Sequence, residues 1–179
     1  MTAPGRLIFV RVAIVFVVAL ASVRTSAHAD ALKVGDKLAE FDVGVDGNGA
    51  LFKLKSLKGK WVLVTVGASW CKPCKKELPT WDKLAGLLKD KIVFVAVNVD
   101  DEIATGKKFN KQLKLKNMTL VYMPADKSAV VERYGSDTMP TSFVADRNQV
   151  VKYVKARFEE RDADGELKRF KAELEKLIK

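Results

Sequence analysis

The sequence predicts a single α/β domain in which helices cover both faces of a mixed β-sheet, with a β-hairpin at its N-terminal end. Two observations support this fold class. Apolar runs rich in β-branched residues alternate with stretches of helical periodicity, as expected for buried strands and the helices packed on them. The chain then continues with two short strands and a last helix, an order that adds an antiparallel pair to a parallel core.

The first 29 residues predict a secretory signal peptide that precedes this domain. They contain three arginines and no acidic residue, and the stretch from Val12 to Val23 is apolar except for one serine. That stretch is shorter than the roughly 20 residues that span a bilayer. The segment ends in Ala27-His28-Ala29, the form of an A-x-A cleavage site. We expect cleavage after Ala29, which leaves one domain over residues 30–179 as a soluble periplasmic or otherwise extracytoplasmic protein.

An uncleaved membrane anchor is the alternative. In that case the apolar run would extend back through Leu7 and would place Arg11 in hydrocarbon, where a charge is costly. Cleavage is favoured because the span is short and the A-x-A sequence is present. No cysteine lies near the cleavage site, so we expect no lipid-modified N-terminus.

Composition excludes several kinds of chemistry. The only histidine, His28, lies in the predicted signal peptide, so the domain lacks an imidazole for Ser/His/Asp or Cys/His catalysis. Two cysteines cannot fill the four-ligand shell of a structural zinc site. The 32 basic residues exceed the 22 acidic ones, but they alternate with acids and form no basic block. We therefore expect solvated charged faces and no nucleic-acid partner, with an acidic partner as a minor alternative.

The N-terminal half contains a hairpin, two central strands and a helix. The hairpin strands are Phe41–Val45 and Leu51–Leu54, joined by a turn with two glycines. The central strands are Trp61–Val66 and Ile92–Val99, which are nearly continuous apolar runs. Between them, apolar residues recur every three or four positions and predict a helix over Lys72–Lys89 with one buried face. Pro79 lies within this helix and predicts a kink.

The remaining elements follow in a regular order. We expect a helix over Asp101–Leu113, a strand over Met118–Tyr122, a short helix over Lys127–Tyr134, an antiparallel strand pair Thr141–Ala145 and Val150–Val154, and a last helix over Asp164–Ile178. The last helix would bury Leu167, Phe170, Leu174 and Leu177.

Cys71 and Cys74 are the only cysteines, and their two-residue gap at the start of the predicted helix suits a reversible disulfide. The helix N-terminus and the neighbouring lysines favour a thiolate, so Cys71 is the predicted nucleophile. Cys74 would be the resolving thiol that attacks the mixed disulfide. The alternative is an inert structural bridge, although a bridge that closes so short a loop constrains the unfolded chain little.

Three segments carry a resemblance to a known family. They are Ala68-Ser69-Trp70-Cys71-Lys72-Pro73-Cys74 with the following Lys75-Lys76-Glu77-Leu78-Pro79, then Val97-Asn98-Val99-Asp100, and lastly Tyr134 to Val144 with its Met139-Pro140-Thr141. Together they resemble the thioredoxin-like proteins and, through Glu77 and Pro79, the exported TlpA/ResA-type branch. The resemblance implies a thioredoxin-like fold and thiol:disulfide oxidoreductase activity. It also implies a cis Pro140 that faces the cysteine pair and an active-site role for Glu77.

Two positions depart from the family pattern. Thr65 stands six residues before Cys71, where thioredoxins carry a buried Asp that accepts a proton. Val66-Gly67 replaces a Phe-Trp pair, which we expect to loosen the packing behind the site. These departures concern the rate of electron transfer and the redox potential.

Glu77 and the predicted docking residues each have an alternative interpretation. Glu77 lies three residues beyond Cys74 on the same helix face, so we expect it to tune Cys74 or accept its proton. It could instead be a solvated side chain paired with a lysine. Trp70 and Met139 would form an apolar rim for a partner chain, and Thr141 with the backbone before Pro140 a docking edge. Core packing is the alternative for Trp70.

The predicted function is exchange of the Cys71–Cys74 dithiol or disulfide with protein substrates. The resemblance implies work in cytochrome c or copper-centre assembly and a membrane thiol electron donor, while the net direction stays open. We expect no cofactor and no resident metal. One alternative is a Cu(I)-binding assembly module that uses both thiolates. Another is a thiol peroxidase, which is disfavoured because Ala68 stands where peroxiredoxins carry a threonine.

Overall fold

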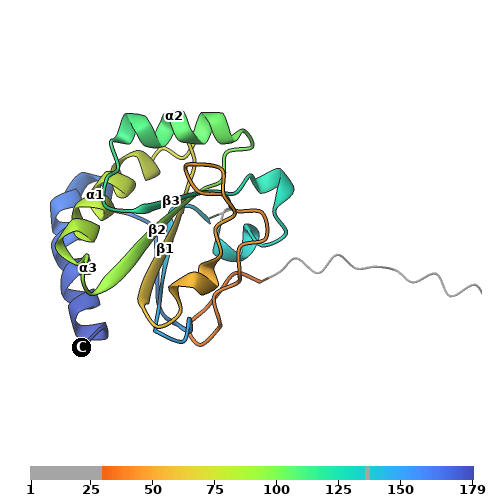
Figure 1. Cartoon of the computed structure of the whole chain (residues 1–179). Helices are drawn as coiled ribbons and strands as arrows, with labels where there is room; N and C mark the ends of the chain where they lie inside the picture. The colour runs from red at the N-terminus through yellow and green to blue at the C-terminus, as the bar shows by residue number, and fades with distance from the viewer. Residues whose placement is uncertain (1–29, 136–137) are drawn as a thin grey trace, which may run out of the picture.

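A computed structural model describes residues 30–135 and 138–179, and the predicted signal peptide lies outside these ranges. The described chain forms a five-stranded sheet in the order β3-β2-β1-β4-β5 (Figure 1). The predicted cleavage after Ala29 and the anchor alternative concern residues outside the described ranges. None of the described helices is long and apolar enough to span a membrane.

The centre of the sheet is parallel. β1 (Trp61–Gly67) and β2 (Ile92–Asn98) run side by side in continuous register, and β3 (Thr119–Tyr122) is parallel to β2. On the other side of β1, β4 (Thr141–Ala145) and β5 (Val151–Ala156) are antiparallel. The mixed sheet is therefore confirmed, with its two apolar runs as the central strands. Both are buried almost throughout, as a strand with covered faces should be.

Successive side chains of β1 point to opposite faces of the sheet and enter two separate cores. Leu63 packs in the core beneath α1 (Cys74–Leu87), α2 (Ile103–Leu113) and α3 (Ala163–Leu177). Val62 and Val64 pack in the other core, which the N-terminal segment covers together with the short 3-10 helices η1 (Leu54–Leu57) and η3 (Glu132–Tyr134). Figure 1 shows these two layers on opposite sides of the sheet.

Two segments differ from the sequence prediction. The N-terminal hairpin is reduced to one bridge between Val45 and Leu51, because the backbone of Val45 pairs with Tyr122 at the edge of β3. The segment Lys127–Tyr134 is not one helix: η2 (Ala125–Lys127) and η3 are separated by extended backbone at Ser128. The carboxylate of Asp42 accepts hydrogen bonds from Ser128 Oγ and Ala129 N, which gives these donors partners outside a helix.

Candidate functional site

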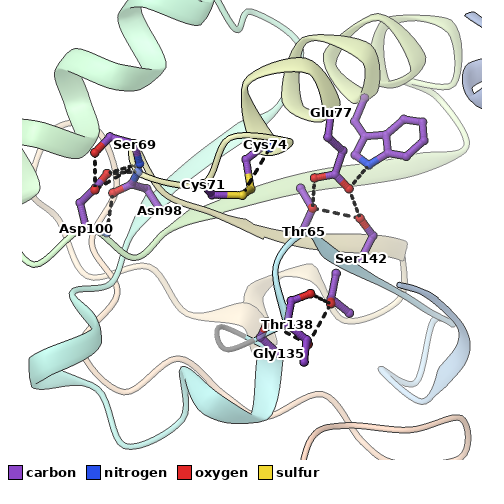
Figure 2. The surroundings of a disulfide bond; sticks show 12 residues. Thr65, Ser69, Cys71, Cys74, Glu77, Asn98, Asp100, Gly135, Thr138 and Ser142 are labelled. Atoms are coloured by element: carbon purple, nitrogen blue, oxygen red, sulfur yellow. Dashed lines mark hydrogen bonds between the residues drawn. A yellow bond between two sulfur atoms is a disulfide. The ribbon is translucent and has the colours of Figure 1, made fainter. Parts of the chain in front are cut away.

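The two cysteines lie where β1 meets α1 and are joined by a disulfide, with their Cα atoms 5.3 Å apart (Figure 2). Cys71 precedes the first turn of α1, and its sulfur accepts a hydrogen bond from Cys74 N at 3.3 Å. Cys71 is 5% exposed and Cys74 is fully buried. Of the two cysteines, only Cys71 therefore has surface that another protein chain could reach.

A buried carboxylate that sequence reasoning missed holds the turn before Cys71. Asp100 accepts hydrogen bonds from Ser69 N at 3.0 Å and from Ser69 Oγ at 2.7 Å, and Asn98 Nδ2 donates to it at 2.8 Å (Figure 2). Gly106 of α2 leaves the space for Asn98, since a Cβ there would stand 2.0 Å from Asn98 Oδ1. Asn98 and Asp100 at the end of an apolar strand were the available signal, but the sequence alone does not identify Ser69 as the partner of Asp100.

Glu77 is fully buried behind the disulfide, so the alternative of a solvated side chain is wrong. Its carboxyl accepts hydrogen bonds from Trp81 Nε1 at 2.7 Å, Ser142 Oγ at 3.2 Å and Thr65 Oγ1 at 3.4 Å. Thr65 occupies the strand position at which the family pattern has a buried Asp. The structure instead supplies a carboxyl from α1, and the Thr65 hydroxyl hydrogen-bonds to it (Figure 2).

Burial raises the pKa of Glu77 from its ordinary value of 4.5 to about 7, because a desolvated carboxylate is disfavoured. The hydrogen bonds from Trp81, Ser142 and Thr65 oppose this shift, as does the positive charge of Lys155. Both the protonated and the charged form of Glu77 are therefore populated near neutral pH. Such a group can accept and return a proton under ordinary conditions.

The strand behind the site packs closely against α1, and the expected loosening at Gly67 is wrong. A Cβ on Gly67 would lie 3.1 Å from Leu78 Cδ1 and 3.7 Å from Cys74 Sγ. The absence of a side chain at this position lets the helix that carries Cys74 approach the strand directly. Although Gly67 stands where the family pattern has an aromatic residue, α1 occupies the space that such a side chain would fill.

The Met139–Pro140 peptide bond is cis, in agreement with the expectation from the resemblance. Pro140 O accepts a hydrogen bond from Arg157 N at 3.0 Å, and Thr141 Oγ1 donates to Thr138 O at 3.1 Å. Thr141 is only 4% exposed, so its hydroxyl serves the loop itself. Of the predicted docking residues here, Met139 is the one with a partly exposed side chain, and it packs against both cores.

Trp70 is 65% exposed, so the core-packing alternative for this residue is wrong. Lys72, Lys75 and Lys76 are also exposed near the disulfide, and Lys76 Nζ donates to Glu160 O at 3.4 Å. An apolar indole and lysine charges therefore border the accessible side of Cys71. Residues 30–135 and 138–179 contain no cluster of three or more His, Cys, Asp or Glu placed to hold a metal ion.

Comparisons with known proteins agree with this geometry. Residues 33–174 match the redoxin family. The thiol-disulfide oxidoreductase ResA of Bacillus thuringiensis is 31% identical over 146 residues, which cover 80% of this chain and 82% of that protein. The ResA protein of Geobacillus thermodenitrificans is 30% identical over 69% of this chain and 70% of its own length. Among solved structures, a protein of Chlorobium tepidum assigned as the thiol:disulfide interchange protein DsbE superposes with a TM-score of 0.66. It is 29% identical and covers 79% of this chain and 98% of its own.

Proposed function

This chain belongs to the redoxin family and is a thioredoxin-like thiol-disulfide oxidoreductase of the TlpA/ResA type, and from this we propose that Cys71, Cys74 and Glu77 carry out its exchange reaction. One observation carries the assignment of roles. Cys71, which retains 5% exposure, is joined by a disulfide to the fully buried Cys74, and Glu77 of the helix that begins at Cys74 carries a buried carboxyl with a pKa of about 7.

In the reducing direction, the Cys71 thiolate attacks one sulfur of a substrate disulfide and releases the other as a thiolate, which takes up a proton. Cys74 then transfers its thiol proton to the Glu77 carboxylate and attacks Cys71. The mixed disulfide breaks, the second substrate thiolate leaves, and the Cys71–Cys74 disulfide forms. Two electrons pass to the substrate, and the same steps reversed oxidise a dithiol.

Glu77 suits this role because of its position and its environment. Residues three apart share a helix face, so Glu77 lies on the side of α1 that carries Cys74. Its carboxyl is held by donors from three elements: Trp81 of α1, Thr65 of β1 and Ser142 of β4. These three donors hold the carboxyl in one orientation, which limits the reorganisation that accompanies proton transfer.

The substrate is proposed to be a protein chain that docks beside Cys71. The exposed indole of Trp70 and the partly exposed side chain of Met139 supply apolar contacts. The backbone at the cis Pro140 supplies the extended edge, as in the recognition of peptides by strand addition. Thr141 then acts by shaping this loop through its bond to Thr138.

The cellular setting is part of the same proposal. The signal sequence supports export, cleavage after Ala29 and action in the periplasm or another extracytoplasmic compartment. The TlpA/ResA resemblance supports a membrane thiol donor of electrons and a role in cytochrome c or copper-centre assembly. N-terminal sequencing of the exported protein tests the cleavage: a chain that begins at Asp30 agrees with it, and one that begins at Met1 refutes it.

The exchange itself is tested by trapping. Cys74→Ser retains the nucleophile but cannot resolve, so it should accumulate mixed disulfides with protein substrates that dithiothreitol releases. Cys71→Ser is the matched control and should trap little, because its remaining thiol is buried. Equal trapping by both variants, or trapping only by Cys71→Ser, would refute the assignment of the nucleophile. Alkylation of mildly reduced wild-type protein with iodoacetamide gives an independent check, since Cys71 should react first.

A further inference from the structure

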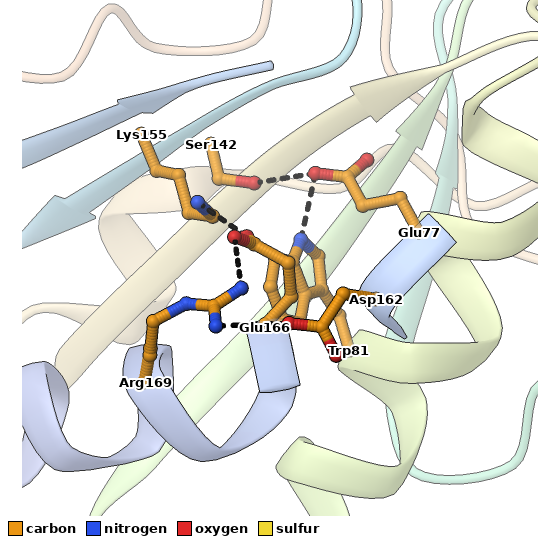
Figure 3. Close-up of polar contacts among 7 residues, drawn as sticks. All are labelled: Glu77, Trp81, Ser142, Lys155, Asp162, Glu166 and Arg169. Carbon is orange, nitrogen blue, oxygen red and sulfur yellow. Dashed lines mark hydrogen bonds and ion pairs between the residues drawn. The ribbon is translucent and has the colours of Figure 1, made fainter. Parts of the chain in front are cut away.

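Lys155 lies beside the hydrogen-bond network of Glu77, on the strand next to Ser142. In the antiparallel pair of β4 and β5, Lys155 is the direct partner of Ser142, and the Ser142 hydroxyl donates to the Glu77 carboxyl. The Lys155 side chain is only 17% exposed, and its ammonium stands 5.7 Å from the centre of the Phe170 ring. Figure 3 shows Lys155 and Ser142 on the same side of the sheet as Glu77.

Aromatic side chains connect the surroundings of Lys155 to those of Glu77. Trp81, which donates to Glu77, packs against Phe170 with ring centres 4.8 Å apart and edge-to-face against Phe158 at 5.4 Å. Glu77 and Trp81 are both fully buried, so the inner side of the network is shielded from water. A charge in such a place acts more strongly on its neighbours than a charge in water does.

Glu166 of α3 holds the ammonium of Lys155 in this place. Lys155 Nζ is 2.6 Å from Glu166 Oε2, and Arg169 binds the other oxygen of Glu166 at 3.1 Å. Although burial opposes it, these two cations hold the pKa of Glu166 below its ordinary value, so Glu166 stays charged. Arg169 also pairs with Asp162 at 2.9 Å, which ties the cluster to the start of α3 (Figure 3).

We propose that the Lys155–Glu166 pair is an outer part of the active site, which holds a positive charge beside the Glu77 network and thereby governs how readily Glu77 becomes negatively charged. Lys155 is a positioning residue in this proposal, since it touches neither substrate nor sulfur. The proposal rests on the function proposed for Glu77 only where it is extended to the rate of thiol exchange.

The polar and charged groups near Glu77 determine whether each substitution raises or lowers its pKa. They are Cys74 and Trp81 of α1, Thr65 of β1, Ser142 of β4, Lys155 of β5, Glu166 and Arg169 of α3, and Asp162 of η5 (Glu160–Asp162). With the disulfide closed, Cys74 does not titrate, so the carboxyl of Glu77 can be followed alone. Removing the cation should raise the pKa of Glu77, and removing the acid that offsets the cation should lower it.

The test is a pH titration of the oxidised protein labelled with ¹³C in its Glu carboxyl carbons, with the Glu77 signal assigned by its absence in Glu77→Gln. We expect Lys155→Met to raise the pKa of Glu77 by about half a unit to one unit, less than the one to three units of a direct contact. Glu166→Gln should lower it by a similar amount, and the double variant should lie between the two. Lys155→Arg retains the charge and should leave the titration close to that of wild type.

A charge effect shifts the pKa of Glu77 in opposite directions in Lys155→Met and Glu166→Gln, which distinguishes it from structural damage. A variant that merely loosened the site would admit water and would move the pKa of Glu77 down toward 4.5 in both cases. Lys152→Met is the matched control, because Lys152 lies on the same strand but is 42% exposed and pairs with Asp146. The proposal is overturned if Lys155→Met lowers the pKa of Glu77 or leaves it unchanged, or if Lys152→Met raises it equally.

A second readout separates this proposal from the function proposed for Glu77. The rate of insulin disulfide reduction is measured against pH for the same variants. If the Glu77 titration moves as expected but the rate profiles do not follow, the charge control by Lys155 stands and the proton transfer by Glu77 fails. If the Glu77 titration does not move while the wild-type profile still has its inflection near the pKa of Glu77, the control by Lys155 fails and the role of Glu77 stands.

Discussion

Replacement of Glu77 by glutamine should change how the stability of the oxidised protein depends on pH. The carboxyl has a pKa of about 7 in the folded state and an ordinary value of 4.5, a difference of about 2.5 pH units. A carboxyl whose pKa is raised by folding stabilises the fold fully below the unfolded value. Because each unit is worth about 1.4 kcal/mol, the full contribution is about 3.5 kcal/mol, of which about 3 kcal/mol is lost as the pH rises from about 4.5 to 7.5.

Glu77→Gln lacks this titration but retains an acceptor for Trp81 and nearly the same shape. The free energy of unfolding of the variant, relative to wild type, should therefore increase by about 3 kcal/mol between pH 4.5 and 7.5. Urea denaturation at several pH values, with the disulfide intact in both proteins, measures this difference. If the two stability curves run parallel across this range, the carboxyl does not titrate as a buried group and the reasoning is refuted.

Three further substitutions test other parts of the site. Asp100→Asn should destabilise the protein by about 1.5–3 kcal/mol in urea denaturation, because its hydrogen bonds to Ser69 are weaker. The same variant should reduce insulin more slowly. Unchanged stability would mean that the carboxylate does not hold the turn. Gly67→Ala should cost about 1–3 kcal/mol because its Cβ meets Leu78, and a thermal melt at or above the wild-type midpoint would contradict the close packing. Trp70→Ala should leave stability within about 0.5 kcal/mol, since the side chain is exposed, yet raise KM for a protein disulfide and not for a small aromatic disulfide. Equal effects of Trp70→Ala on both substrates would argue against a docking role.

The sequence predicted the parts of the fold that depend on pattern. Nearly continuous apolar runs led to β1 and β2, and the three-four spacing led to α1, because burial on both faces or on one face leaves those signatures. The segments that differed from the prediction were short, and their structure depends on backbone or side-chain partners far away in the sequence. Asp42 binds the backbone at Ala129, and Val45 pairs with Tyr122, contacts that no local pattern records.

The site was predictable to a similar extent. The cysteine pair follows from spacing, and the cis bond before Pro140 follows from resemblance. The burial of Glu77 was not settled, because a glutamate among lysines on a helix has the same local sequence whether it is solvated or enclosed. Only the tertiary structure brings Ser142 and Thr65 to its carboxyl, and only strand register places Lys155 opposite Ser142.

The position of the buried carboxyl has a physical consequence for exchange chemistry. Glu77 lies on the same helix as Cys74, three residues beyond it, so the geometry of that helix fixes their separation. The fold loses about 3 kcal/mol at neutral pH by keeping this carboxyl buried, because the ionised form is poorly solvated there. The same poor solvation makes Glu77 a stronger base than an exposed carboxylate, so the instability and the capacity to accept a thiol proton have one origin. A substitution that solvates Glu77 should therefore lower its pKa, remove the cost of ionising it inside the fold and weaken it as a base, all at once.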